Sequence, residues 1–83
     1  MTNEHADIES WMSDTWESLL SFQPNGPESN FFEIGGDSLM MLELLTAIDQ
    51  KFSIEFPVTV AFKEPTLGGM ISEVKRQTSS DAA

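Results

Sequence analysis

The sequence contains no cysteine and few basic residues. Without cysteine the chain forms no disulfide and offers no thiolate to a metal ion or a substrate. Four Lys and Arg residues stand against fourteen Asp and Glu residues, which gives a formal net charge of −10. This charge repels the phosphates of nucleic acids, so we expect no binding to them. It favours a soluble monomer that is attracted to basic surfaces on partner proteins.

Long hydrophobic runs are also absent. No apolar run approaches the roughly 18 residues that a membrane-spanning helix needs, so we expect no membrane partner. Residues 1–5 are polar and acidic, unlike a secretory signal or an arginine-rich transit peptide, which predicts a cytoplasmic location. A chain of 83 residues makes one small domain with a single modest core and little room for a deep substrate cavity.

Apolar residues recur at helical spacing in the first half of the chain. The first predicted helix spans Glu4–Phe22 and turns one apolar stripe inward. This stripe comprises Ile8, Trp11, Met12, Leu19 and Phe22, with Trp16 and Leu20 at its edge. The second spans about Ser38–Phe52. Its buried side comprises Met41, Leu44, Leu45, Ile48 and Phe52, with Leu42 at the border.

Two further helices are predicted in the second half. A short third helix covers about 57–62, because a proline can open it and another proline closes it off. Thr66 is a predicted N-cap for a last helix through about Gln77. This helix buries Leu67, Met70, Ile71 and Val74. Gly68 and Gly69 each weaken it by about 1 kcal/mol relative to alanine, and we expect close approach to a neighbouring helix to be the reason.

The segment 23–37 is a long loop for so small a domain. Phe31, Phe32 and Ile34 within it predict that the loop is pinned to the core. Such pinning fixes the direction in which the residue at the start of the second helix, Ser38, points.

These elements predict an all-α fold, a small right-handed four-helix bundle with a long loop between the first two helices and a short third helix. Residues 1–83 form one domain in this prediction, ordered over about 4–77. The polar residues 78–83 are predicted to be a disordered tail.

Ser38 stands where the long loop becomes the second helix, directly after Gly35, Gly36 and Asp37. A hydroxyl there projects into solvent beside backbone N–H groups that have no helical partner, and such N-termini favour phosphate by about 0.3–1 kcal/mol. The glycines leave room for an enzyme to approach. The residues alone leave two roles open, a serine that carries a phosphodiester or one that caps its own helix. Asp37 either stabilises the helix dipole or contacts a modifying enzyme and its metal ion.

Several segments resemble the landmarks of one family in order and spacing. Residues 15–20, Thr-Trp-Glu-Ser-Leu-Leu, resemble its first-helix signature, and residues 30–39, Asn-Phe-Phe-Glu-Ile-Gly-Gly-Asp-Ser-Leu, resemble its attachment motif. Residues 55–57, Glu-Phe-Pro, and 62–67, Phe-Lys-Glu-Pro-Thr-Leu, match later landmarks. Over nearly its whole length the chain therefore resembles phosphopantetheine-dependent carrier proteins, closest to the peptidyl carrier proteins of nonribosomal peptide synthesis.

The resemblance implies that a phosphopantetheinyl transferase moves 4′-phosphopantetheine from coenzyme A onto Ser38, with Gly36, Asp37 and Leu39 as the flanking motif. The arm ends in a thiol that holds aminoacyl, peptidyl or acyl groups as thioesters, and the chain itself is not an enzyme. The implied partners are the transferase, an adenylation or other acyl-loading enzyme, and downstream condensation, ketosynthase, transfer or tailoring enzymes. The carrier raises the effective concentration of a tethered intermediate at each of them.

The subtype rests on the glycine pair. Gly35-Gly36 before Asp37-Ser38 resembles the peptidyl type, because fatty-acid and many polyketide carriers more often have a single glycine there. The high acidic content leaves an acyl carrier protein of a polyketide or fatty-acid pathway open as an alternative. An unmodified interaction module that keeps the fold is a third. Because Met1 is followed almost at once by the first helix and the tail is short, we expect a free-standing carrier.

Gly36-Asp37-Ser38-Leu39 also reads as the motif of the GDSL hydrolases, an alternative from a different class. Such an enzyme needs a histidine to deprotonate the serine and an acid to orient it. The only histidine is His5, which precedes the serine, whereas in these hydrolases it comes late in a much longer chain. No calcium-loop motif and no histidine pair occurs, so no metal site is predicted.

Leu39, Met40, Glu43 and Ala47 fall on the side of the second helix that the pattern turns outward. Scattered exposed apolar residues need no functional explanation. Every enzyme that serves the arm must nevertheless approach the base of this helix, and methionine adapts to several partners. We predict that partners dock on this face through a small apolar contact ringed by their basic side chains.

Overall fold

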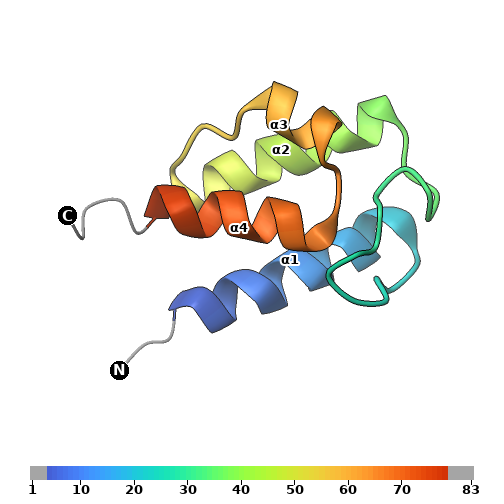
Figure 1. Ribbon diagram of the computed structural model, residues 1–83, viewed down its shortest axis with the longest axis horizontal. Helices are drawn as coiled ribbons and strands as arrows, with labels where there is room; N and C mark the ends of the chain where they lie inside the picture. Colours follow the sequence, from blue (N-terminus) through green and yellow to red (C-terminus); the bar gives the residue numbers. More distant parts are fainter. Residues whose placement is uncertain (1–3, 79–83) are drawn as a thin grey trace.

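The computed structural model describes residues 4–78, and within that range the chain forms four α-helices and no strand (Figure 1). The helices are α1, Glu4–Leu20; α2, Ser38–Phe52; α3, Val58–Lys63; and α4, Leu67–Thr78. These bounds confirm the all-α class, the long loop after the first helix and the short third helix. The part of the predicted tail that follows α4 lies outside the described residues.

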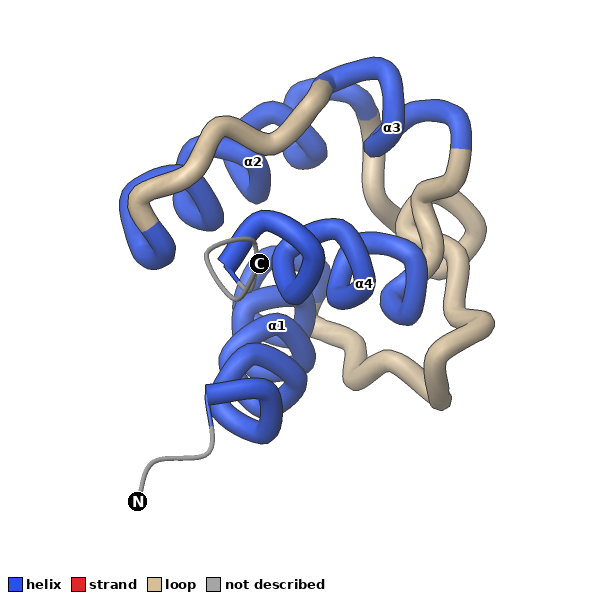
Figure 2. The backbone as a smooth tube through the Cα atoms, turned by 60° about the vertical axis from the view of Figure 1, so that its left-hand side comes forward, coloured by secondary structure: helices blue, strands red, loops and turns tan. Residues whose placement is uncertain are grey.

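The core lies between the three longer helices, and α1 packs against both α2 and α4. In Figures 1 and 2, α3 lies next to α2 on the side away from α1. The buried apolar side chains are Ile8, Met12, Trp16, Phe31, Met41, Leu44, Leu45, Ile48, Phe56, Ala61, Leu67, Met70 and Val74. The predicted buried sides of α2 and α4 are confirmed, except that Phe52 and Ile71 are only half-buried.

Two predictions about α1 are wrong. Trp16, expected at the edge of the apolar stripe, is wholly buried. It lies edge-on to Phe31, with ring centroids 5.1 Å apart, so the loop contributes to covering this side of α1. Phe22, expected in the stripe, is 60% exposed. The helix ends at Leu20 and Ser21 takes a left-handed conformation (φ 57°), which carries Phe22 out of helical phase.

The long loop is tied to the start of α4 by backbone hydrogen bonds. The Phe31 N–H donates to the Pro65 carbonyl (2.8 Å), and the Leu67 N–H donates to the Ser29 carbonyl (3.0 Å). Asn30 and Thr66 form an isolated antiparallel bridge between these two bonds. The predicted pinning of the loop is therefore confirmed, and it is made by the backbone as well as by the buried Phe31 ring.

The start of α4 shows why two glycines are tolerated there. A Cβ on Gly68 would lie 3.0 Å from the Cβ and 3.1 Å from the carbonyl oxygen of Pro27, so the close neighbour is the loop. The expectation of a neighbouring helix at Gly68 is wrong. A Cβ on Gly69 would lie 2.9 Å from Thr66 Oγ1, which accepts the Gly69 N–H at 3.0 Å. This bond confirms Thr66 as the N-cap of α4.

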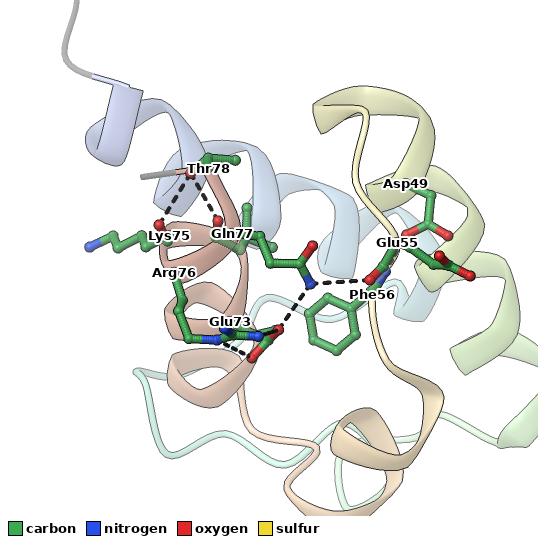
Figure 3. A network of polar contacts seen from close by, with 9 residues as sticks. Asp49, Glu55, Phe56, Glu73, Lys75, Arg76, Gln77 and Thr78 are labelled. Atoms are coloured by element: carbon green, nitrogen blue, oxygen red, sulfur yellow. Dashed lines mark hydrogen bonds and ion pairs between the residues drawn. The ribbon is translucent and has the colours of Figure 1, made fainter. Parts of the chain in front are cut away.

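A polar network closes the end of the bundle where α2 finishes and the chain turns toward α3 (Figure 3). The Gln77 side chain donates to the Glu55 carbonyl (3.1 Å) and to Glu73 Oε2 (2.9 Å), and Asp49 Oδ1 accepts the Phe56 N–H (2.9 Å). Hydrogen bonds from Arg76 hold the pKa of Glu73 below its usual range. The network fixes the link between α2 and α3 at the opposite end of α2 from Ser38.

Candidate functional site

The N-terminus of α2 is capped by Asp37 and not by Ser38. The Asp37 backbone is extended (φ −132°, ψ −179°), and its Oδ1 accepts the Met40 N–H at 2.8 Å. Its carbonyl accepts the Met41 N–H at 2.9 Å, which is the first bond of the helix. An aspartate is among the best residues for this position, and its charge also suits the dipole. The first of the two roles predicted for Asp37 is thus present in the fold.

Ser38 is the first residue of α2, and its side chain is exposed. Among residues 4–78 no group forms a hydrogen bond with its hydroxyl, because the capping role belongs to Asp37. The amides of Ser38 and Leu39 precede the first helical hydrogen bond and face the same end of the helix. A primary hydroxyl beside such amides fits a covalently attached phosphate group, since the N–H groups and the dipole favour negative charge.

The two glycines before Asp37 have different reasons to be glycine. Gly35 has φ +120°, a conformation that side-chain-bearing residues rarely adopt, and open space surrounds it. At Gly36 an added Cβ would overlap the Phe31 ring and lie 2.8 Å from the Phe31 carbonyl oxygen. The Gly36 N–H donates to that same carbonyl at 2.9 Å. The structure thus explains the pair by a turn and by packing, whereas the sequence argument proposed clearance for an enzyme.

The predicted partner face on α2 is only partly exposed. Leu39 is 69% exposed and Glu43 is exposed, but Met40 and Ala47 are half-buried. The outward placement of Met40 is wrong in this respect, because Met40 packs against the edge of the core cluster. The buried side of α2 therefore extends as far as Met40 and Ala47.

Besides Phe22, three exposed apolar side chains lie outside the predicted partner face. Leu42, placed at the border of the buried side, is 46% exposed. Val58 and Phe62 share one face of α3 at a spacing of four residues and are 50% and 38% exposed. Phe62 also stacks on Phe32, with ring centroids 5.7 Å apart. The sequence feature that could have indicated this exposed pair is two apolar residues on a helix too short to bury both.

The charge around the N-terminus of α2 has one sign. Between His5 and Lys51 the sequence contains no basic residue, so both the long loop and the first three turns of α2 are free of cations. Glu33, Asp37 and Glu43 are exposed in this stretch. Within the described residues, no cluster of three His, Cys, Asp or Glu side chains is placed to hold a metal ion. None of the helices over 4–78 is both long and apolar enough to cross a membrane.

Comparison with known proteins gives the same picture. The sequence profile of the family described as "Phosphopantetheine attachment site" matches residues 10–74. Phosphinothricin tripeptide synthetase PhsC of Streptomyces viridochromogenes is 34% identical over 74 residues, which are 89% of this chain and 7% of the synthetase. The solution structure of an active-site mutant peptidyl carrier protein matches with a TM-score of 0.80 and 28% identity, over 94% of this chain and 83% of that one.

A second solved structure holds the phosphopantetheine transferase Sfp in complex with coenzyme A and a peptidyl carrier protein. It matches with a TM-score of 0.75 and 30% identity, over 81% of this chain and 87% of the matched chain. The chain spans only a small part of its curated relatives, 7% of PhsC and 1% of tyrocidine synthase 3 of Brevibacillus parabrevis. These findings confirm the resemblance to carrier proteins and give no support to the hydrolase alternative.

The family match covers most of the chain, and the helices follow those of solved peptidyl carrier proteins. Phosphopantetheine is the cofactor of this family, and its members are carrier domains and not catalysts. The chain therefore belongs to the phosphopantetheine attachment-site family, with the fold of a peptidyl carrier protein.

Proposed function

We propose that Ser38 carries 4′-phosphopantetheine and that the chain presents aminoacyl or peptidyl thioesters to the enzymes of nonribosomal peptide synthesis. One observation carries the proposal. Ser38 is the exposed first residue of α2, and Asp37 takes over the capping that would otherwise occupy its hydroxyl. The peptide synthetases among the relatives support the peptidyl type.

Attachment requires one exchange of bonds. Ser38 Oγ forms a bond to the phosphorus next to pantetheine in coenzyme A, and the pyrophosphate bond breaks. Adenosine 3′,5′-bisphosphate leaves, and the serine proton passes to a base on the transferase. The carboxylate next to Ser38 in the sequence, that of Asp37, accepts the Met40 N–H as the helix cap, which fits a proton acceptor supplied by another enzyme.

When bound, the arm supplies a thiol that holds the intermediate as a thioester. The residues of this chain hold the base of the arm in place and provide the surface on which partners dock. A tether of this kind works by raising the effective concentration of the intermediate at each enzyme. The cofactor and the carrier role follow from the family, whereas Ser38 as the attachment point and the enzymes served belong to the proposal.

The absence of cysteine gives this proposal a direct test. Any nucleophilic thiol in the modified protein must belong to the arm, because methionine sulfur is a thioether. We expect a maleimide dye to label the apo protein not at all, and to label it once after incubation with coenzyme A and a broad-specificity transferase. Mass spectrometry of the labelled protein counts the dyes. A labelled apo protein, or an unlabelled product, would refute the proposal.

The partner face remains as proposed, with Leu39, Met40, Glu43 and Ala47 on α2. The exposed Leu39 and the half-buried Met40 offer a small apolar contact close to Ser38. The stretch without cations around them supports partners whose docking surfaces are basic. We include the transferase, an adenylation or acyl-loading enzyme and the downstream enzymes among these partners. A monomeric chain in the cytoplasm stays a prediction.

Glu43→Lys is expected to slow acyl loading of the holo protein and to flatten its dependence on salt, while the helix content stays unchanged. A rim charge acts mainly on the association rate, and salt screens it over about 8 Å at physiological ionic strength. Stopped-flow loading kinetics at several salt concentrations measure the effect. The matched control is Glu17→Lys, an equal charge change at an exposed position on α1. Equal slowing of loading by the two variants would show that net charge alone matters.

The polyketide or fatty-acid alternative differs from the main proposal in its cargo. The intact mass of the protein purified from its native host reports both the arm and the group it carries. An aminoacyl or peptidyl mass supports the peptidyl type. A fatty-acyl or malonyl mass would instead establish the alternative.

A further inference from the structure

Phe31 is the most deeply buried residue of the long loop, and it joins the loop to α1. Its ring is wholly buried and lies edge-on to Trp16, with centroids 5.1 Å apart. It also lies edge-on to Phe32 at 5.9 Å, and Phe32 in turn stacks on Phe62 of α3. Aromatic pairs at these distances contribute beyond the area they bury. The ring therefore has a fixed position relative to both helices.

The backbone of Phe31 is fixed as well. Its N–H donates to the Pro65 carbonyl in the link between α3 and α4 (2.8 Å), and its carbonyl accepts the Gly36 N–H (2.9 Å). Asn30 Oδ1 accepts the amides of Phe32 and Glu33 at 3.0 and 3.2 Å, which tightens the turn between these two bonds. The segment 30–36 is thus a closed turn attached to the core at its first end.

Gly36 transmits this attachment to the reactive serine. It packs directly on the Phe31 ring, so closely that an added Cβ would overlap the ring. The next residue, Asp37, caps α2 by accepting the Met40 N–H. A change that frees Gly36 from the Phe31 ring therefore also weakens the hydrogen bond by which Asp37 caps α2. The first turn of α2 frays when this cap is lost. Ser38 lies in that first turn.

We infer that Phe31 is a positioning residue for the reaction at Ser38, acting through Gly36 and the Asp37 cap. This inference rests on the proposed function of Ser38. A hydroxyl that must meet a phosphorus atom in line loses rate steeply when its position spreads, and a shift of about 1 Å can cost about 10²-fold. The exposed residues farther along α2, such as Glu43, keep their places when only the first turn frays. Leu39 and Met40 of the proposed partner face share this turn, so docking of the transferase weakens as well. The chemical step slows more than docking weakens, because it depends on the exact position of the hydroxyl.

Two variants disrupt the contact between Phe31 and Gly36, one at each of the two residues. Phe31→Leu removes the ring but keeps an apolar side chain, and Gly36→Ala pushes the segment off the ring. The control is Val74→Ala, a wholly buried position of α4 that is not among the residues that tie down Gly36. Each apo variant is incubated with coenzyme A and a broad-specificity transferase at a temperature at which circular dichroism shows it folded.

We expect kcat for phosphopantetheinylation to fall by about tenfold or more in Phe31→Leu and Gly36→Ala, and KM for the carrier to rise by a smaller factor than that by which kcat falls. Hydrogen exchange at the Met40 amide should become faster in both variants without any transferase present. Val74→Ala should leave kcat, KM and this exchange rate unchanged. In the double variant that combines Phe31→Leu with Gly36→Ala, the two losses of kcat should be less than additive. The leucine side chain leaves more room for the added Cβ at residue 36 than the phenylalanine ring does.

The outcomes separate the inference from the function on which it rests. Wild-type kcat in both variants, or an equal loss of kcat in Val74→Ala, would overturn the positioning role of Phe31 alone. A rise in KM with unchanged kcat would also overturn it, because it would place the effect on docking. A wild-type protein that the transferase leaves unmodified would overturn the proposed function and this inference with it.

Discussion

Replacing Ser38 with alanine is expected to abolish modification by coenzyme A and a broad-specificity transferase, while the wild type gains one phosphopantetheine. The hydroxyl is the group that forms the bond to phosphorus, and alanine has none. The exposed position and the cap supplied by Asp37 predict that the fold survives the change, since the Ser38 hydroxyl makes no hydrogen bond with another described residue. Intact-mass spectrometry of both proteins after incubation measures the effect.

The matched control for this variant is Ser72→Ala, which removes another exposed serine from a helix, here α4. It should be modified as fully as the wild type. Circular dichroism of the apo forms should show equal helix content in all three proteins. Full modification of Ser38→Ala would mean that another hydroxyl accepts the arm.

Trp16→Ala is expected to give the largest loss of stability of any change outside the loop. Truncating a buried tryptophan costs about 3–5 kcal/mol, and a domain of this size has about 4–12 kcal/mol in total at 0.05–0.15 kcal/mol per residue. The Trp16 indole nitrogen has no hydrogen-bond partner among the described residues, so packing alone provides the stabilisation. The midpoint of urea unfolding, followed by far-ultraviolet circular dichroism, measures the loss.

Trp11→Ala is the control for this prediction, because the same side chain is removed from the same helix. Trp11 is only half-buried and lies edge-on to Phe52, with centroids 5.2 Å apart. Its truncation should lower the unfolding midpoint clearly less than truncation of Trp16. Equal losses from the two variants would contradict the burial that distinguishes them.

The helices could be predicted because each one is marked by its own apolar periodicity, capping residue or flanking proline. The apolar period of α2 gave its span, Ser38–Phe52, and the proline and threonine residues around α3 and α4 marked where the chain breaks and restarts. Thr66 was recognisable as a cap from its residue type and its place before an apolar run. Local rules of this kind need no knowledge of the neighbours.

The errors arose where the loop acts as part of the core. The pattern placed Trp16 at the edge of the apolar stripe of α1, whereas in the fold the buried Phe31 ring of the loop packs on it. Gly68 meets the loop at Pro27 and not a helix, for the same reason. The left-handed residue that ends α1 and releases Phe22 to solvent is Ser21, a residue type that gives little warning of this conformation.

The sequence indicated Ser38 as the candidate attachment residue. It did not indicate which residue caps α2 or which residue Gly36 packs against. The motif identified Ser38, whereas the choice between capping by Ser38 and by Asp37 depends on one hydrogen bond that only coordinates show. The contact of Gly36 with Phe31 was hidden as well, because it joins residues on opposite sides of a turn. The sequence also did not indicate that Val58 and Phe62 of α3 are exposed to solvent.

The attachment of the arm to Ser38 is tested most directly by locating the added mass within the chain. The wild-type protein is incubated with coenzyme A and the transferase, digested, and sequenced by tandem mass spectrometry. We predict a single phosphopantetheine on Ser38 and no modification of any other serine or threonine. A modification found at another hydroxyl, with Ser38 unmodified, would contradict the account.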